Sequence, residues 1–533
     1  MLVELLLALG AYVLYRFINV VYARLTSPLR HVRGPKSPNF VMGNMAQLFG
    51  GVVTGIEEQW VEEYGTTFKI NGFLSQADLY TIDTKALHHI LTHTHIYQKP
   101  SEVQYNLGRQ VGPGLLVVEG DVHKHQRRIM NPAFGSPQIR ELTRIFVEKS
   151  AQLRDIWKAK AAQNGGSARV EAMSDITKAT LDIIGLAGFN HNINALGTRS
   201  DDAPDPLASA FETLSASERQ FNLWRNLQGV YPILRYITTH EDRIGRAAQA
   251  EMMRIGRQLL ASSKRDIADT GTFETGRARD LLNLLVRANT SKEIPIHQRL
   301  SDEAVLTQVP TFLVAGHETT STAVTWALFA LTQNVKAQTR LREQLLSIDT
   351  DTPTLDELNS LPYLECVVRE TLRVYAPVQS SVRVALAGDV IPLAQPYTDT
   401  QGNIHDTIRV AKDTFIVIPI LTLHRDPTLW GADAKEFIPE RWESPLTTSI
   451  PGVYGKLLTF LGGPRNCIGY RFALAEMKAL LFTLIRGFEF ELAVPKADVA
   501  ARSISVTQGP FLLSDVEAGG GQLPLLVRPV MRA

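Results

Sequence analysis

One long stretch of this chain is apolar almost all round. Residues 302–334 show this pattern, which is typical of a helix that passes through a protein core. Pro310 falls within the stretch, so a kink or a local break is expected there. Residues 139–289 predict further helices, which are joined by polar linkers at 190–206 and 264–279.

Strand patterns are short and lie in the first and last thirds of the chain. Residues 66–70 and 79–82 predict a hairpin, because they alternate or are rich in β-forming residues on either side of an Asn-Gly pair. Residues 415–419 predict a buried strand. Residues 85–91 predict a helix, and residues 101–119, with several glycines and a proline, predict a long loop of the kind that lines a site.

The pattern at the amino terminus predicts a membrane segment. Residues 1–22 are mostly apolar, and about twenty apolar residues in a helix suffice to cross a bilayer core. Basic residues follow this run, which places the body on the cytoplasmic side. No small-residue cleavage site ends the run, so a retained anchor is favoured over a removed signal peptide, and a helix lying in the interface is the alternative. The predicted parts are a single-pass transmembrane anchor (1–22), a basic, proline-rich hinge (23–40) and one large body (41–533).

The composition narrows the classes of function. With 55 Lys and Arg against 54 Asp and Glu, the net charge of +1 indicates neither a nucleic-acid partner nor an acidic ligand. Two cysteines leave no disulfide framework and favour a reducing compartment. Cys366 lies among apolar residues and is predicted to belong to the core, which leaves Cys467 as the candidate for chemistry.

Cys467 follows a glycine-rich turn and precedes a run of strong helix formers. A thiol at the start of a helix meets unpaired N–H groups and the positive end of the dipole, which favour the thiolate, a soft ligand for iron. Gly463 and Gly469 would let a flat group approach the backbone closely. Arg465 is a candidate to pair with a carboxylate of that group, and Phe460 to shield the sulfur from water.

Residues 460–469 fit Phe-x-x-Gly-x-Arg-x-Cys-x-Gly at every fixed position and resemble the haem-binding loop of the cytochrome P450 family. The resemblance implies that Cys467 is the axial thiolate ligand of haem b, which favours cleavage of an O–O bond. For a lone cysteine a structural role in the core is the alternative. The complete motif followed by a helix outweighs that alternative.

An acid, a hydroxyl and a glycine interrupt the long apolar stretch, within Ala315-Gly316-His317-Glu318-Thr319. Polar groups inside a buried helix are costly, and such violations concentrate at functional sites. Gly316 would make room for a flat group and a gas, Thr319 would bond back to a carbonyl and loosen the helix, and Glu318 would pass protons. A kinked helix with satisfied polar residues is the alternative. The stretch resembles the Ala/Gly-Gly-x-Glu/Asp-Thr motif of the family, which implies catalytic roles in oxygen binding and proton delivery for Glu318 and Thr319.

Two further motifs resemble the family. His123 and Arg127 lie four residues apart in a basic stretch, and the resemblance implies that they hold a haem propionate, with His where many relatives have Trp. A basic helix on the surface is the alternative. Glu370 and Arg373, together with Arg441, resemble the buried ion triad that supports the haem loop.

The resemblance also implies a second propionate contact and a substrate pocket. Arg383 is the propionate candidate. The pocket candidates are Phe312, Leu313, Ala315, Val378, Val382 and Phe511.

The motifs occur in the family's order and the resemblance covers about residues 33–530. It implies a single-domain, mainly helical α+β fold with a small β-rich side. The implied reaction inserts one oxygen atom from O2 into a C–H bond, with electrons from NADPH through a separate NADPH–cytochrome P450 reductase at the endoplasmic reticulum. The anchor and the apolar pocket favour a lipophilic substrate, and the likeness to fungal members favours a terpenoid or another secondary metabolite.

Two other functions are weighed against this reaction. A haem-thiolate isomerase or dehydratase would need neither O2 nor a reductase, and the intact Glu318-Thr319 pair argues against it. A non-catalytic haem or lipid carrier would need no proton-delivery residues at all.

Overall fold

The computed structural model of the chain divides into two compact units. The first, called the β-rich unit, comprises Met1–Pro100, Gln379–Ala434 and Thr448–Asn466, and the second, called the helical unit, comprises Ser101–Val378, Lys435–Thr447 and Cys467–Ala533. The structure describes residues 4–530 apart from 5–6, 8–9, 12–14, 16–17, 19–20, 50–54, 199–204, 219–222, 271–279, 291–298, 446–447, 504–505 and 519.

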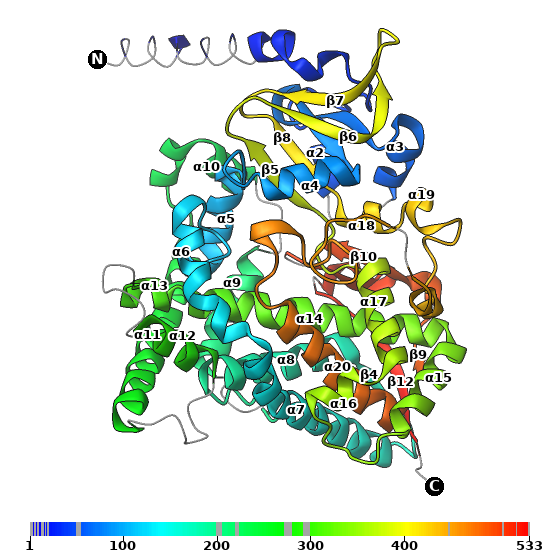
Figure 1. Cartoon of the computed structure of the whole chain (residues 1–533). Helices are drawn as coiled ribbons and strands as arrows, with labels where there is room; N and C mark the ends of the chain where they lie inside the picture. Colours follow the sequence, from blue (N-terminus) through cyan, green and yellow to red (C-terminus); the bar gives the residue numbers. More distant parts are fainter. Residues whose placement is uncertain are drawn as a thin grey trace. The chain divides into compact units, whose positions relative to one another are not determined.

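The β-rich unit is built on a five-stranded sheet in the order β1-β2-β8-β5-β3 (Figure 1). β1 and β2 pair antiparallel, which confirms the predicted hairpin, and β8 joins β2 in parallel. The side chains of Phe68, Ile70 and Leu79 are completely buried, so the sheet supplies the core of this unit. The strands are β1 (Thr67–Asn71), β2 (Ala77–Thr81), β3 (Tyr97–Gln98), β5 (Ser381–Ala385) and β8 (Phe415–Ile418).

Short helices and a separate hairpin complete the β-rich unit. The Asp83 carboxylate accepts hydrogen bonds from the backbone N–H groups of Lys85 and Ala86 and so caps α4, which confirms the helix expected at 85–91. The remaining elements are α2 (Met45–Phe49), α3 (Ile56–Tyr64), α4 (Thr84–Thr92), α18 (Ile420–His424), α19 (Pro427–Trp430) and the antiparallel pair β6 (Asp389–Thr398) and β7 (Ile404–Val410).

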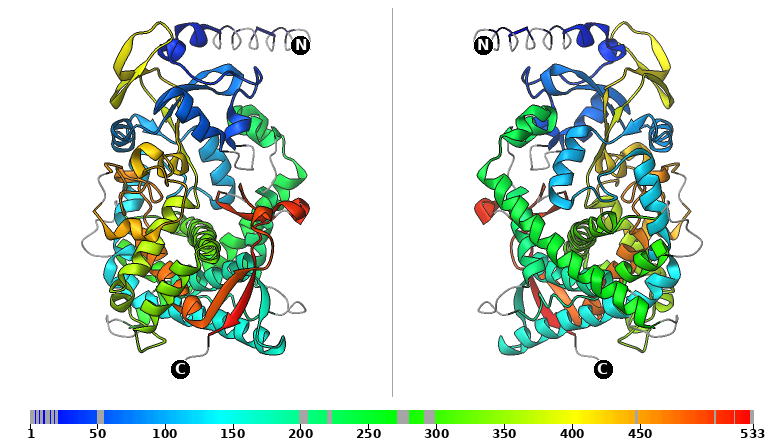
Figure 2. Two further views of the ribbon diagram at one scale, coloured as in Figure 1. Left: turned by 90° about the vertical axis from the view of Figure 1, so that its right-hand side faces the viewer. Right: turned by 90° about the vertical axis from the view of Figure 1, so that its left-hand side faces the viewer.

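The helical unit surrounds one central helix, α14 (Gln308–Gln333). Figure 2 shows α14 nearly end-on with other helices of this unit around it. Its neighbours include α8, α17 and α20. The helices are α5 (Ser101–Val111), α6 (Gly120–Met130), α7 (Ser136–Gln163), α8 (Ala172–Phe189), α9 (Pro206–Glu218), α10 (Leu223–Val230), α11 (His240–Thr270), α12 (Leu281–Thr290), α13 (Asp302–Leu306), α15 (Val335–Leu346), α16 (Leu355–Asn359), α17 (Pro362–Val374) and α20 (Tyr470–Gly487).

The break expected near Pro310 exists but precedes the proline. The chain leaves α13 and enters α14 at Thr307, so Pro310 lies in the first turn of α14. The first four N–H groups of a helix have no partner within it, so a proline there sacrifices no hydrogen bond. The proline therefore starts the long helix instead of kinking it.

The loop expected at 101–119 is a helix over its first half, so that prediction was wrong there. α5 spans Ser101–Val111 and contains Gly108, and it packs against α10. A glycine inside a helix costs only about 1 kcal/mol, which packing readily outweighs.

Two small sheets belong to the helical unit. One has the order β4-β12-β9, and the other is the hairpin β10-β11. Their bounds are β4 (Ala168–Glu171), β9 (Phe488–Leu492), β10 (Val499–Ser503), β11 (Gln508–Leu512) and β12 (Pro524–Pro529). The expectation of a mainly helical protein with small sheets is confirmed.

Within the described part of the chain, no helix is both long and apolar enough to cross a bilayer. Most of residues 1–20, which carry the predicted anchor, lie outside the described residues. The anchor therefore stays a prediction.

Candidate functional site

The central helix α14 exposes a short face in the middle of the helical unit. Most of its side chains are buried, yet Ala315 is exposed, and Gly316 and Thr319 are partly so. Residues four apart lie on the same face of a helix, so Ala315 and Thr319 face the same way. We call Ala315 and Thr319 the open face of α14. The open face is therefore the accessible part of the middle of α14.

The hydroxyl of Thr319 bonds back into its own helix, as expected. Its Oγ1 donates to the carbonyl oxygen of Ala315 at 2.8 Å. A threonine that takes a carbonyl in this way competes with the helical hydrogen bond and loosens the turn. The observation fits an opening in α14 at the point where a small molecule would lie.

Glu318 is buried beside the open face. Its Oε1 accepts a hydrogen bond of 2.8 Å from the hydroxyl of Thr507, the residue before β11. Its neighbour His317 donates through Nδ1 to the carbonyl oxygen of Leu313 at 2.6 Å, and burial lowers the pKa of His317 to about 4. His317 is therefore neutral near pH 7, and the acid of this turn is Glu318.

Gly316 has a packing role that the motif did not reveal. A Cβ at this position would lie 2.9 Å from Cδ1 of Ile184 on α8, closer than real Cβ contacts come. The glycine thus lets α8 and α14 approach each other. Its predicted contact with haem stays a prediction.

The sulfur of Cys467 is accessible, although many protein atoms lie around it. The side chain is exposed, yet desolvation raises the pKa of its thiol, which is opposed by a backbone hydrogen bond from Gly469 and by the charge of Arg127. The thiolate expected at the start of α20 is the form that binds iron, so a metal bound here would displace the proton of the thiol.

Arg127 and His123 occupy one side of α6. His123 is buried and Arg127 is half-buried, and the two lie one helical turn apart. The charge of Arg127 acts on the Cys467 thiol, so the guanidinium lies near the sulfur. A cation in this place fits a carboxylate on a group bound to Cys467, as the motif implies.

A haem bound through Cys467 fits these residues of the helical unit. The sulfur is accessible, a guanidinium lies near it, and α14 has an open face within its buried length. The sulfur would bind the iron, the guanidinium would pair with a propionate, and the open face would border the space beyond the ring.

Three predicted haem contacts belong to the β-rich unit. Arg383 is buried and donates from Nη1 to Ser381 Oγ at 2.9 Å and to the Val382 carbonyl oxygen at 2.7 Å. Arg465 is half-buried in the short turn before Cys467. Phe460 is buried, with its ring centroid 6.0 Å from that of Tyr454. Their contacts with haem stay predictions.

The predicted ion triad forms. Glu370 and Arg373 are completely buried and paired at 2.7 Å, and Arg441 Nε lies 3.6 Å from the same carboxylate. The motif did not reveal two further donors to this carboxylate, the backbone N–H of Ile438 and Nε1 of Trp442, each at 2.9 Å. The carboxylate is therefore held by several donors from α17 and the turn Pro439–Glu443 (η6).

The predicted pocket residues differ in accessibility. Ala315 is exposed and Val378 is half-buried, whereas Leu313 has no exposed surface. The Phe312 ring packs edge-on against Phe134 at 5.5 Å between centroids. The two other candidates are Val382, which is half-buried, and Phe511, which is buried. Ala315 has the clearest access to a ligand, and the substrate contacts stay predictions.

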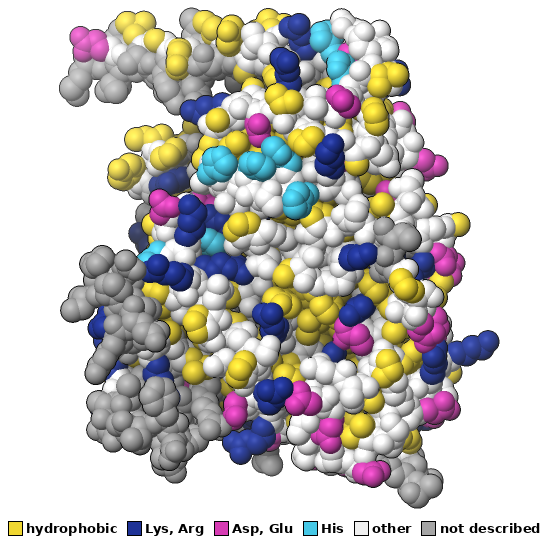
Figure 3. All heavy atoms as spheres, in the orientation of Figure 1, with side chains coloured by type: hydrophobic (Ala, Val, Ile, Leu, Met, Phe, Trp, Pro, Cys, Tyr) yellow, Lys and Arg dark blue, Asp and Glu magenta, His cyan; other side chains and the backbone are white. Residues whose placement is uncertain are grey.

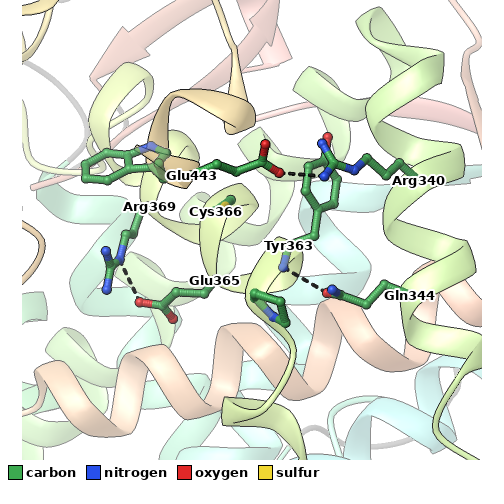
Figure 4. Close-up of a pocket in the computed structure, with 9 residues that line it drawn as sticks. Arg340, Gln344, Tyr363, Glu365, Cys366, Arg369 and Glu443 are labelled. Carbon is green, nitrogen blue, oxygen red and sulfur yellow. Dashed lines mark hydrogen bonds and ion pairs between the residues drawn. The ribbon is translucent and has the colours of Figure 1, made fainter. Parts of the chain in front are cut away.

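A separate pocket of about 460 Å³ opens between α15, α17 and η6 (Figure 4). Ion pairs line it, because Arg340 bonds Glu443 and Arg369 bonds Glu365 at 2.7 Å. Cys366 lies in this pocket, and desolvation raises the pKa of its thiol. The charged walls already satisfy one another and the thiol is unreactive, as expected of a core cysteine.

Histidine side chains gather over α4 on the face of the β-rich unit seen in Figure 3. The rings of His89 and His93 stack with centroids 4.0 Å apart, and His89 Nε2 pairs with Asp389 Oδ2 at 2.9 Å. Across the described residues, no group of three or more His, Cys, Asp or Glu side chains is arranged to hold a metal ion. Stacked rings do not point their nitrogens at one point, which agrees with that finding.

The family model for cytochrome P450 matches residues 32–513 of the chain. The chain belongs to the cytochrome P450 family. This P450 is 50% identical to cytochrome P450 monooxygenase 128 of Postia placenta, over 99% of this chain and 97% of the relative, and 48% identical to monooxygenase 205 of the same fungus, over 99% and 98%. It is 32% identical to cytochrome P450 monooxygenase claW of Ampulloclitocybe clavipes, over 95% and 93%.

Membership in this family makes the protein a cytochrome P450 monooxygenase, and members bind haem b through a cysteine thiolate. The recognition from the Cys467 loop and the α14 motif is thus confirmed. Thr507 was missed as a partner of Glu318, because no short-range pattern links residues 189 positions apart.

Proposed function

We propose that this P450 inserts one oxygen atom from O2 into a C–H bond of a lipophilic small molecule, a terpenoid or another secondary metabolite. The observation that carries the proposal is the accessible Cys467 thiol in the same unit as the open face of α14. The relatives are fungal monooxygenases, which supports the reaction class.

The reaction needs two electrons and two protons for each O2. One oxygen atom enters the C–H bond as a hydroxyl and the other leaves as water. NADPH supplies the electrons through a separate NADPH–cytochrome P450 reductase. When bound to Cys467, haem supplies the activation of O2.

The residues of α14 bring the protons. Glu318 lies beside the open face and takes protons from solvent at its carboxyl oxygens. The Thr319 hydroxyl, now bonded to Ala315, lies on the face where the proton is needed. Arg127 and His123 orient the bound group through its carboxylates.

A membrane location also belongs to the proposal. Ile233, Tyr236 and Ile237, at and beside the turn Pro232–Tyr236 (η4), are 72%, 85% and 56% exposed. Exposed apolar residues of this size favour contact with lipid. Together with the apolar first 22 residues they support a single-pass anchor in the endoplasmic reticulum, with the substrate arriving from the bilayer.

The test is co-expression with a P450 reductase in yeast, with terpenoid, steroid and fatty-acid mixtures as substrates and mass spectrometry of the products. We expect NADPH-dependent addition of one oxygen atom to a terpenoid. Cys467→Ala is expected to abolish the red-shifted Soret band of the reduced carbon monoxide complex. A Cys467→Ala protein that keeps the band would refute the ligand assignment.

A haem-thiolate isomerase or dehydratase is the alternative, and a non-catalytic carrier is the next. Conversion of a peroxide substrate without NADPH or O2 would favour the isomerase. Ligand binding without product in any of the mixtures would favour the carrier.

A further inference from the structure

Glu318 lies at the edge of the open face of α14 and not on it. With 3.6 residues per turn, its position is rotated about 60° around the helix axis from that of Ala315. Its side chain is buried, whereas Ala315 is exposed and Thr319 is partly so. The buried Glu318 carboxyl therefore lies beside the accessible part of α14.

The group that holds this carboxyl is Thr507. The Thr507 hydroxyl donates to Glu318 Oε1 at 2.8 Å, and Thr507 is itself buried. The hydroxyl of Thr322, one turn after Glu318 on α14, donates to Thr507 Oγ1 at 3.4 Å. A chain of hydroxyls from Thr322 through Thr507 thus ends on the acid and polarises the last bond toward it.

Thr507 has a fixed position relative to α14. The next residue, Gln508, begins β11, and its N–H donates to the carbonyl oxygen of Pro377 at 2.7 Å. Its own carbonyl oxygen accepts a hydrogen bond of 2.8 Å from Nε1 of Trp326 on α14. Because β11 is attached at both points, the Thr507 hydroxyl stays in place when the Glu318 side chain turns.

We propose that Thr507 is a positioning residue that helps to hold the Glu318 carboxyl in reserve beside the open face, and that rupture of this bond lets the carboxyl turn to deliver a proton. In this step the freed carboxylate takes up one proton from solvent and passes it to the Thr319 hydroxyl or to a water next to it, so that it ends as a carboxylate again. The inference rests on the proposed function, which assigns proton delivery to Glu318.

The strength of the bond sets the expected effect. A hydrogen bond to a charged group shifts an equilibrium by a factor of roughly 10 to 100. Loss of the hydroxyl therefore shifts the equilibrium between the orientations of the Glu318 side chain by that factor, toward those that point away from β11. An acid that is no longer held in reserve delivers protons at the wrong stage of the cycle, so electrons from NADPH are lost to hydrogen peroxide.

The experiment compares Thr507→Val with Thr507→Ser in the full-length, haem-loaded protein with its reductase. Valine keeps the shape of threonine and removes the hydroxyl, whereas serine keeps the hydroxyl. Thr325→Val is the matched control, because Thr325 is equally buried on α14 but bonds only to the Ser321 carbonyl oxygen of its own helix. We expect the product formed per NADPH to fall several-fold in Thr507→Val alone, with a matching rise in hydrogen peroxide.

A structural readout separates this inference from the proposed function. In a crystal structure of Thr507→Val we expect the Glu318 carboxyl to have turned away from β11, and in Thr507→Ser to remain. A carboxyl that stays in place, or unchanged product per NADPH in Thr507→Val, would overturn the inference. If the wild-type protein formed no product with its reductase, the proposed function would fail instead. If Glu318→Gln left product per NADPH unchanged, the role of the acid itself would be refuted.

Discussion

Glu370 and Glu476 are two completely buried carboxyl groups of the helical unit whose surroundings are opposite. Glu370 on α17 accepts hydrogen bonds from Arg373, from the N–H of Ile438 and from Trp442. Neither oxygen of Glu476 on α20 has a hydrogen-bond partner in good geometry among the described residues. Burial raises the pKa of Glu476 well above its usual value, and the nearby Thr320 hydroxyl opposes the rise only in part.

The difference shows how a cation and donors change the surroundings of an interior acid. Glu370 has a buried cation and several donors, and together they hold the turn around it. Glu476 has almost none, and burial raises its pKa, which favours its neutral form. Three measurements test this contrast, beginning with the largest effect.

Glu370→Ala should be the most damaging change. It leaves the Arg373 guanidinium fully buried without its carboxylate, which costs about 3–5 kcal/mol. Urea unfolding measures the loss. The matched control is Glu251→Ala on α11, where Glu251 and Arg254 form an exposed pair with the same spacing at 2.6 Å, and we expect a much smaller loss there because solvent screens the pair. Equal losses at both sites would contradict the contrast.

His317 extends the same rule to a base. The pKa of His317 is about 4 in the folded chain and about 6.5 in the unfolded chain. Between these two pH values the unfolded chain binds a proton at His317 and the folded chain does not. Stability should therefore fall by up to about 3 kcal/mol as the pH drops from 6.5 to 4. His317→Gln keeps a donor for the Leu313 carbonyl and should lack this loss. Identical unfolding curves for both proteins at pH 5 would refute the assignment.

Glu476→Gln should act with the opposite sign, as a gain in stability at pH 7. Because the folded pKa is raised, the unfolded chain gives up a proton above about pH 4.3 while the folded chain keeps it, so the wild type loses stability as pH rises. The amide does not titrate, and the variant should be the more stable protein at pH 7. Its gain should shrink toward pH 4, at no more than about 1.4 kcal/mol per pH unit. A variant that is less stable at pH 7 would show that Glu476 is ionised.

Short-range patterns predicted the parts of the site that lie within one segment. The Cys467 loop, the turn Ala315–Thr319 and the Glu370–Arg373 pair each span a few residues, so their spacing was sufficient evidence. The confirmed α14 likewise has a continuous pattern. Where the contributing residues are adjacent in sequence, local chemistry and the fold agree.

The rest depends on contacts between distant segments. The contact between Gly316 and Ile184 on α8 gave no signal in the sequence, and the predicted role of Gly316 beside a ligand stays a prediction. Thr507 gave no signal until β11 was placed beside α14. Glycine content suggested a loop at 101–119, but packing against α10 stabilises α5. In each case tertiary contacts outweigh local preference.

The match between Gly316 and Ile184 has a consequence for engineering. At position 316 even alanine would require the Ile184 side chain to shift, because its Cβ would lie 2.9 Å from Cδ1 of Ile184. A library that changes positions 184 and 316 together, with valine or alanine opposite the larger residue, would give the new side chain room without that shift. Selection for new oxidation products would then sample a wider set of side chains at position 316.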